Sequence, residues 1–67
     1  MELTIDQALQ KAIKAHKLGE LQGAERLYRG ILQVEPQHPD ANHNLGVLAV
    51  AVGQPAAALP LFKTALE

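Results

Sequence analysis

The sequence predicts an all-α fold in which two antiparallel helix-turn-helix hairpins stack on each other. Apolar residues recur along the chain with the helical spacing of i, i+3, i+4 and i+7. Glycine and proline interrupt this pattern where helices are expected to end or begin. The chain also aligns with itself after a shift of 34 residues, which pairs Gly19 with Gly53 and Ala24 with Ala58.

The first helix is expected over residues 4–18. Its apolar face begins at Ile5, and Thr4 precedes that face as a potential N-cap residue. Gln7 follows Thr4 at the spacing of a capping box, in which each side chain bonds the backbone N–H of the other residue. Gly19 should end the helix, because glycine readily adopts the left-handed conformation common just past a helix end.

The second helix is expected over residues 21–34. Gly23 and Gly30 lie within it, and each lowers intrinsic helix stability by about 1 kcal/mol relative to alanine. Packing of the apolar face must therefore stabilise this helix. Pro36 and Pro39 bracket the turn that follows.

The third and fourth helices are expected over residues 39–52 and 55–66, with Gly53 ending the third. Pro60 leaves two alternatives open for the fourth. If that helix starts at Pro55, Pro60 removes an internal hydrogen bond and should kink it. If the first turn is loose, Pro60 lies nearer the start of the helix and costs less.

Small and apolar residues recur at equivalent positions of the two halves and set the packing between helices. We expect this role for Ala12, Gly19, Ala24, Tyr28, Pro36, Leu45, Gly46, Gly53, Ala58 and Phe62. Their pattern and the 34-residue period resemble the tetratricopeptide repeat family across essentially the whole chain. The leading tryptophan position of that family holds Ala8 and Asn42 here, so the motif is degenerate.

The resemblance implies a fragment of a right-handed α-solenoid. Residues 1–67 would form one domain, with repeat one at about 5–38 and an incomplete repeat two at about 39–67. Two repeats are fewer than the three or so that usually give stability. We therefore expect an N-terminal excerpt of a larger protein that associates through the open face of its last helix.

In the family, the first helix of each hairpin lines a concave groove that binds a peptide or a partner helix. The positions that would line it here are Leu9, Ile13, His16, Lys17, His43, Val47, Val50 and Ala51. The third helix is apolar nearly all round, which favours an apolar groove. The alternative is that Val47 and Val50 pack within the array or against another chain.

Several functional classes are not expected. A net charge of −1 and few aromatic residues argue against nucleic-acid binding. The Gly53-Gln54-Pro55 break and Pro60 argue against a membrane span. The chain has neither serine nor cysteine as a nucleophile, and its three histidines lack metal-ligand spacing, so we predict no enzyme activity, metal or cofactor. The absence of cysteine fits the cytoplasm.

The leading functional hypothesis is a scaffold that recruits another protein or peptide. One alternative is a homo-oligomerisation segment whose apolar surfaces meet copies of the same chain. The other is a non-catalytic arm that positions substrate for a bacterial transferase domain. The sequence leaves the choice among these three open.

Overall fold

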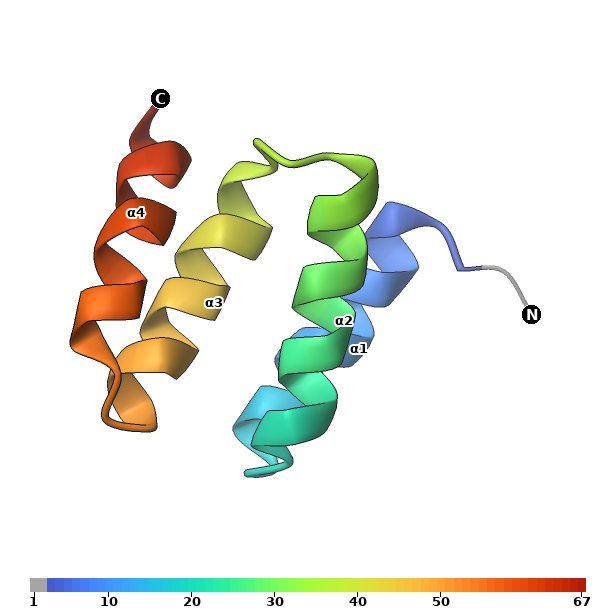
Figure 1. Ribbon diagram of the computed structural model, residues 1–67. Helices are drawn as coiled ribbons and strands as arrows, with labels where there is room; N and C mark the ends of the chain where they lie inside the picture. The colour runs from blue at the N-terminus through green and yellow to red at the C-terminus, as the bar shows by residue number, and fades with distance from the viewer. Residues whose placement is uncertain (1–2) are drawn as a thin grey trace.

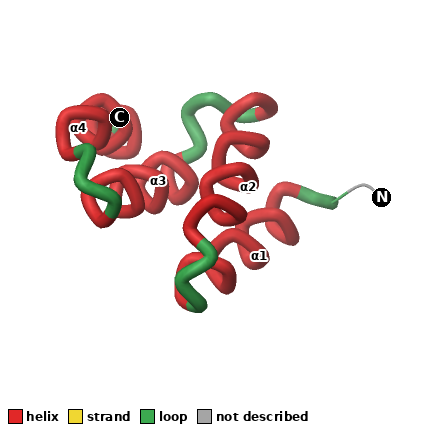
Figure 2. Tube along the Cα trace, turned by 60° about the horizontal axis from the view of Figure 1, so that its bottom comes forward, coloured by secondary structure: helices red, strands yellow, loops and turns green. Residues whose placement is uncertain are grey.

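The computed structural model describes residues 3–67, and these form four helices. The helices are α1 (Ile5–Lys17), α2 (Leu21–Val34), α3 (Pro39–Ala51) and α4 (Pro55–Leu66), and no strand occurs within residues 3–67. Helix α1 pairs with α2, α3 pairs with α4, and α2 packs against α3 (Figure 1). The predicted all-α fold is confirmed, and a second view shows α2 and α3 lying between α1 and α4 (Figure 2).

The helix bounds differ from the predicted ones by at most one residue, because Thr4, Leu18 and Val52 cap helices rather than belong to them. The predicted capping box is present at the start of α1. The Thr4 hydroxyl accepts from the Gln7 N–H at 3.1 Å, and the Gln7 side-chain oxygen accepts from the Thr4 N–H at 3.0 Å. Both residues thus satisfy N–H groups that a helix start leaves without partners.

The turn inside each hairpin has the same construction. Gly19 has a φ of 81° and Gly53 has a φ of 79°, values that strain residues with a side chain. In each turn the glycine N–H donates to the carbonyl three residues earlier, at 3.1 Å. The next N–H donates to the carbonyl five residues before itself, at 2.9 Å after Gly19 and 2.8 Å after Gly53. This pair of bonds is the Schellman motif, and it stops α1 and α3 in the same way.

The turn between the hairpins is fixed by side chains of α3 and its cap. The His38 Nδ1 atom accepts from the Ala41 N–H at 3.1 Å, and Pro39 occupies the first helical position. Asn42 is only 3% exposed, and its Nδ2 donates to the carbonyls of Pro36 at 3.0 Å and His38 at 2.9 Å. Asn42 thereby holds the turn against the start of α3.

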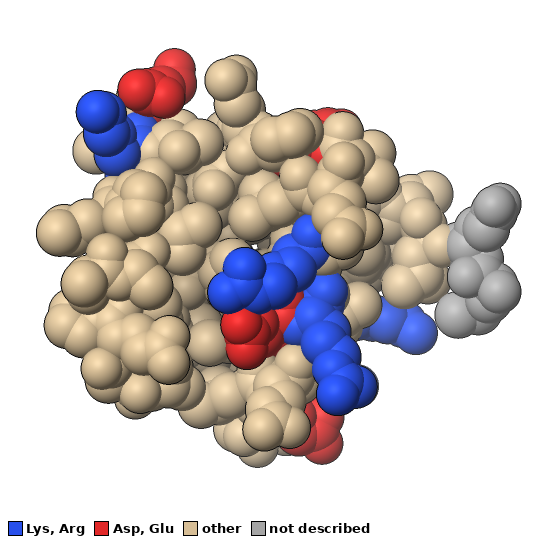
Figure 3. Space-filling view, in the orientation of Figure 1, with Lys and Arg blue, Asp and Glu red and all other residues tan. Residues whose placement is uncertain are grey.

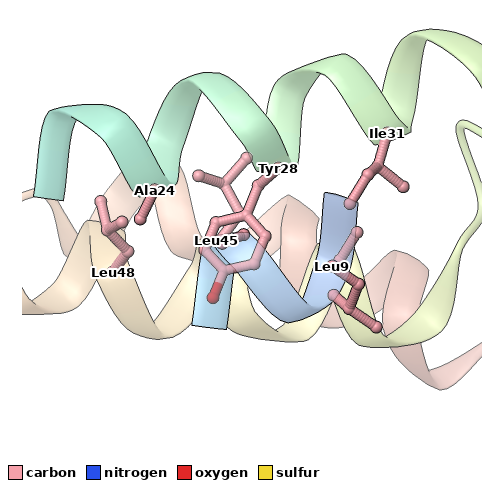
Figure 4. Close-up of a cluster of buried hydrophobic side chains, with 8 residues drawn as sticks. Leu9, Ala24, Tyr28, Ile31, Leu45 and Leu48 are labelled. Carbon is pink, nitrogen blue, oxygen red and sulfur yellow. The ribbon is translucent and has the colours of Figure 1, made fainter. Parts of the chain in front are cut away.

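The core lies where α1, α2 and α3 meet. In the close-up of Figure 4, Ala24, Tyr28 and Ile31 lie along the side of α2 that faces the core. The buried cluster comprises Leu9, Ala12, Ala24, Tyr28, Ile31, Ala41, Leu45 and Leu48. The alanines in this cluster are fully buried, and small residues at such positions allow close approach of neighbouring helices.

In the second hairpin, a glycine of α3 packs directly against an aromatic ring of α4. A Cβ atom added to Gly46 would lie 2.6 Å from Cε1 of Phe62, closer than carbon atoms pack. The ring of Phe62 therefore rests directly on the backbone of α3. His43 adds to this contact, since its ring centroid lies 5.7 Å from that of Phe62 at an angle of 52°.

Helix α4 begins at Pro55 and continues through Pro60. The structure thus contains the first of the two alternatives, in which Pro60 is an interior helical residue. Proline has no N–H, so the carbonyl of Ala56 has no i+4 partner within the helix. Ala56 is exposed, which leaves that carbonyl near solvent.

Candidate functional site

Four of the residues predicted to line a groove come from α1. Ile13 and His16 are half-buried, and Lys17 is exposed near the end of the helix. The prediction for Leu9 needs correction, because this side chain is 7% exposed and belongs to the core cluster. Leu9 therefore stabilises the fold and offers little surface to a partner.

The other four residues come from α3, where they form an exposed strip. His43 and Ala51 are exposed, Val47 is 41% exposed and Val50 is 51% exposed. The two valines are three residues apart and are neighbours on the helix surface. Other sides of α3 are covered by α2 and α4. The described structure does not bury Val47 and Val50 within the array, so this strip is open to solvent.

His16 is tied to the core by an aromatic contact. Its Nδ1 atom lies 3.3 Å from the Tyr28 hydroxyl oxygen, within hydrogen-bonding distance, and the two rings meet edge to face with centroids 6.1 Å apart. Tyr28 is 1% exposed, and burial raises the pKa of its hydroxyl because the phenolate would lose hydration. His16 thus provides a partner for a buried hydroxyl and exposes only part of its ring.

A hollow of about 370 Å³ lies elsewhere, between α2, α3 and α4. None of the predicted groove residues lines it. At its edge, Arg29 Nε lies 2.9 Å from a carboxylate oxygen of Glu25 in an exposed ion pair. The lining residues are Glu25, Arg29, Leu45, Leu48, Ala49, Val52, Gln54, Ala57, Pro60 and Leu61.

Charge is distributed unevenly around this hollow. Figure 3 shows charged side chains gathered over α2, whereas the surface over α3 and α4 is nearly free of charge away from the chain end. The sequence has no Asp, Glu, Lys or Arg between Asp40 and Lys63, which explains this difference. The second hairpin therefore presents a largely neutral and apolar surface.

Within residues 3–67, no three His, Asp or Glu side chains gather closely enough to share a metal ion. None of the helices in this part of the chain is long and apolar enough to cross a membrane.

The arrangement of two nested hairpins with matching turns defines a helical-repeat module. A family model described as tetratricopeptide repeat matches residues 15–67, which is most of the chain. The chain therefore belongs to the tetratricopeptide repeat family and contains about two repeats. Modules of this family are typically non-catalytic scaffolds for protein–protein interaction. The comparisons with curated proteins and with solved structures give no match.

Proposed function

We propose that this chain is a recruitment module that binds an apolar peptide or a partner helix along the exposed strip of α3. The observation that carries the proposal is the exposure of Val47 and Val50 on a helix whose other sides are covered. The 34-residue shift relates Val47 of α3 to Ile13 of α1, and Ala51 of α3 to Lys17 of α1. The binding surface therefore continues from α3 onto α1.

The size of the strip sets the expected strength of binding. Burying a whole valine side chain contributes about 1.5–3 kcal/mol. Val47 and Val50 are already about half buried, so together they contribute roughly the equivalent of one such side chain. A partner must also use Ile13 and His43, and we expect weak, reversible binding rather than a permanent complex.

Paired substitutions test this proposal in the full chain. Val47→Asp combined with Val50→Asp should abolish capture of a partner, because charged groups would replace the apolar contacts. Val34→Asp is the matched control, since Val34 is 70% exposed at the end of α2 and outside the strip. Circular dichroism establishes that both variants fold. Partner capture that is unchanged in a folded double variant would refute the proposal.

A further inference from the structure

Acidic side chains lie at one end of the two helices that carry the proposed binding surface. Asp6 is in the first turn of α1 and Asp40 is in the first turn of α3, and both are exposed. Asp6 precedes Ile13 by seven residues, which is about two helical turns. Asp40 precedes Val47 by the same spacing. Each carboxylate therefore shares a helix face with an apolar residue of the binding surface.

The other end of this surface is basic on α1. Lys17 is exposed in the last turn of α1, four residues after Ile13 and on the same face. Helix α3 has no basic residue in its last turn. Among residues 3–67, the one ion pair joins Glu25 and Arg29. Lys17 and the two first-turn carboxylates thus form no ion pair with each other or with other residues of that range.

The direction of the helices brings like charges to the same edge. Helices α1 and α3 run in the same direction, because α2 runs back between them (Figure 1). Asp6 and Asp40 therefore lie at one edge of the binding surface, and Lys17 lies at the opposite edge. Asp6 and Lys17 are three turns apart along α1, about 16 Å at a rise of about 1.5 Å per residue. Across this distance the surface is acidic, then apolar, then basic.

We propose that the partner is an amphipathic helix that lies antiparallel to α1 and α3, with acidic residues in its first turn and basic residues in its last turn. This inference rests on the proposed function and adds the charge order and the direction of the partner. The first turn of the partner lies beside Lys17, and its last turn lies beside Asp6 and Asp40. The apolar residues between these turns meet Val47 and Val50.

Two electrostatic effects favour this direction. The charges at both edges of the surface meet opposite charges on the partner, whereas a parallel partner of the same sequence would bring its acidic turn to Asp6 and Asp40. The antiparallel arrangement also places the positive N-terminal end of the partner's dipole beside the negative C-terminal ends of α1 and α3. A helix matches the spacing as well, because residues three turns apart share a face with the apolar residues between them.

A second copy of α1 has the same charge order but lacks a free apolar face. Its Leu9 and Ala12 side chains are buried in the core of their own chain. They cannot contact another molecule while that copy is folded. The partner must therefore be a helix whose apolar face is not already packed.

Two synthetic peptides of about 18 residues, a length at which isolated helices begin to form, test the charge order. The first has glutamates in its first turn, leucines along one central face and lysines in its last turn. The second has the same composition with the glutamates and lysines exchanged. Calorimetric titration of the full chain at low salt should show roughly threefold or tighter binding of the first peptide. This preference should shrink at high salt, because ions screen exposed charges.

A neutralised chain separates charge recognition from the helicity of the peptides. Asp6→Asn, Asp40→Asn and Lys17→Gln together should remove most of the preference, because the peptides are unchanged and only the surface charges are lost. Lys63→Gln is the matched control, since it removes an exposed charge on α4, and it should retain the full preference. Circular dichroism establishes that both variants fold.

A spin label tests the direction independently of affinity. A nitroxide on the N-terminus of the first peptide should broaden the amide resonances around Lys17 and Ala51, at the ends of α1 and α3. A nitroxide on its C-terminus should instead broaden those around Asp6 and Asp40. The reverse pattern would overturn the antiparallel direction.

The outcomes distinguish this inference from the proposed function. Equal binding of the two peptides, lost in the Val47→Asp and Val50→Asp variant, would overturn the charge order and leave the binding surface supported. No binding of either peptide would overturn both. A preference that persists in the neutralised chain would come from the peptides alone and would overturn the inference. A dimer of the chain that the neutralising substitutions dissociate would do the same, because a second copy would then be the occupant.

Discussion

Tyr28 and Phe62 occupy equivalent positions of the two hairpins, but their surroundings differ. Tyr28 is enclosed by its own hairpin and by α3, and its hydroxyl reaches His16. Phe62 contacts α3 within its own hairpin and remains half-buried on the other side. The comparison teaches that the local sequence builds each hairpin, whereas the helix packed next to it determines how much of its apolar surface is buried.

The two hairpins also differ at an equivalent small residue of their first helices. The first has Ala12 where the second has Gly46, and both residues are buried. The Cβ of Ala12 fits in the first hairpin, but a Cβ at Gly46 would overlap the ring of Phe62. Gly46 thus allows the aromatic ring of Phe62 to rest on backbone atoms of α3.

The largest expected effect is that of removing Tyr28. Tyr28→Ala should lower the free energy of unfolding by about 3–5 kcal/mol, because it leaves a cavity among three helices. Phe62→Ala should cost roughly half as much, since part of that ring already faces solvent. Urea denaturation followed by circular dichroism measures both, and an equal or larger loss for Phe62→Ala would contradict the proposed asymmetry.

The turn between the hairpins should be nearly as sensitive. Asn42→Ala removes two hydrogen bonds from a buried position, and we expect a loss of about 1–3 kcal/mol in unfolding free energy. The equivalent residue of the first hairpin is already alanine, Ala8. Gln33→Ala, at an exposed position of α2, is the control and should change stability by less than about 0.5 kcal/mol. Similar unfolding midpoints for the two variants would show that Asn42 does not hold the turn.

The contact between Gly46 and Phe62 predicts that two similar glycine-to-alanine substitutions change the stability of the chain in opposite directions. Gly46→Ala should destabilise the chain by roughly 0.5–2 kcal/mol, because overpacking against Phe62 outweighs the gain in helix propensity. Gly30→Ala should stabilise it by about 0.5–1 kcal/mol, since nothing beyond the adjoining residues and the helix's own backbone lies within 4 Å of the added Cβ. Thermal unfolding of both variants tests this pair, and stabilisation by Gly46→Ala would disprove the close contact.

The burial of Tyr28 has a consequence at high pH. The pKa of Tyr28 is raised above the ordinary value of 10.0, so the folded state favours the neutral phenol. The contribution of this neutral phenol to the free energy of unfolding is therefore fully present below pH 10. It is lost as the pH rises through the folded-state pKa. The chain has one tyrosine and no tryptophan, so phenolate absorbance reports on this group alone. Titration at the pKa of a free tyrosine while the chain is folded would contradict the burial.

Much of the fold was predictable because it depends on local chemistry. Thr4 and Gln7 form the expected capping box, and Gly19 and Gly53 have the left-handed conformation expected of helix ends. The 34-residue period predicted the pairing of helices because hairpins of equal length stack in register. The family match is consistent with this reading of the repeat.

The remaining features of the fold and of the candidate site depend on tertiary contacts, which a periodic sequence pattern does not specify. Asn42 was noted only as a departure from the family motif, yet it bonds two carbonyls of the preceding turn. Leu9 shares a helical face with Ile13, but only Leu9 is fully within the core. The hollow between α2, α3 and α4 is lined by side chains from all three helices, so the pattern along any one helix does not predict it.

Amide hydrogen exchange resolved by residue tests the central comparison most directly. A helix covered on both sides should open only on global unfolding, whereas a helix with one uncovered face should open more readily. We therefore predict slower exchange for the amides around Tyr28 in α2 than for those around Phe62 in α4, under conditions where the chain remains folded. Equal protection of the two helices, or slower exchange in α4, would contradict the account.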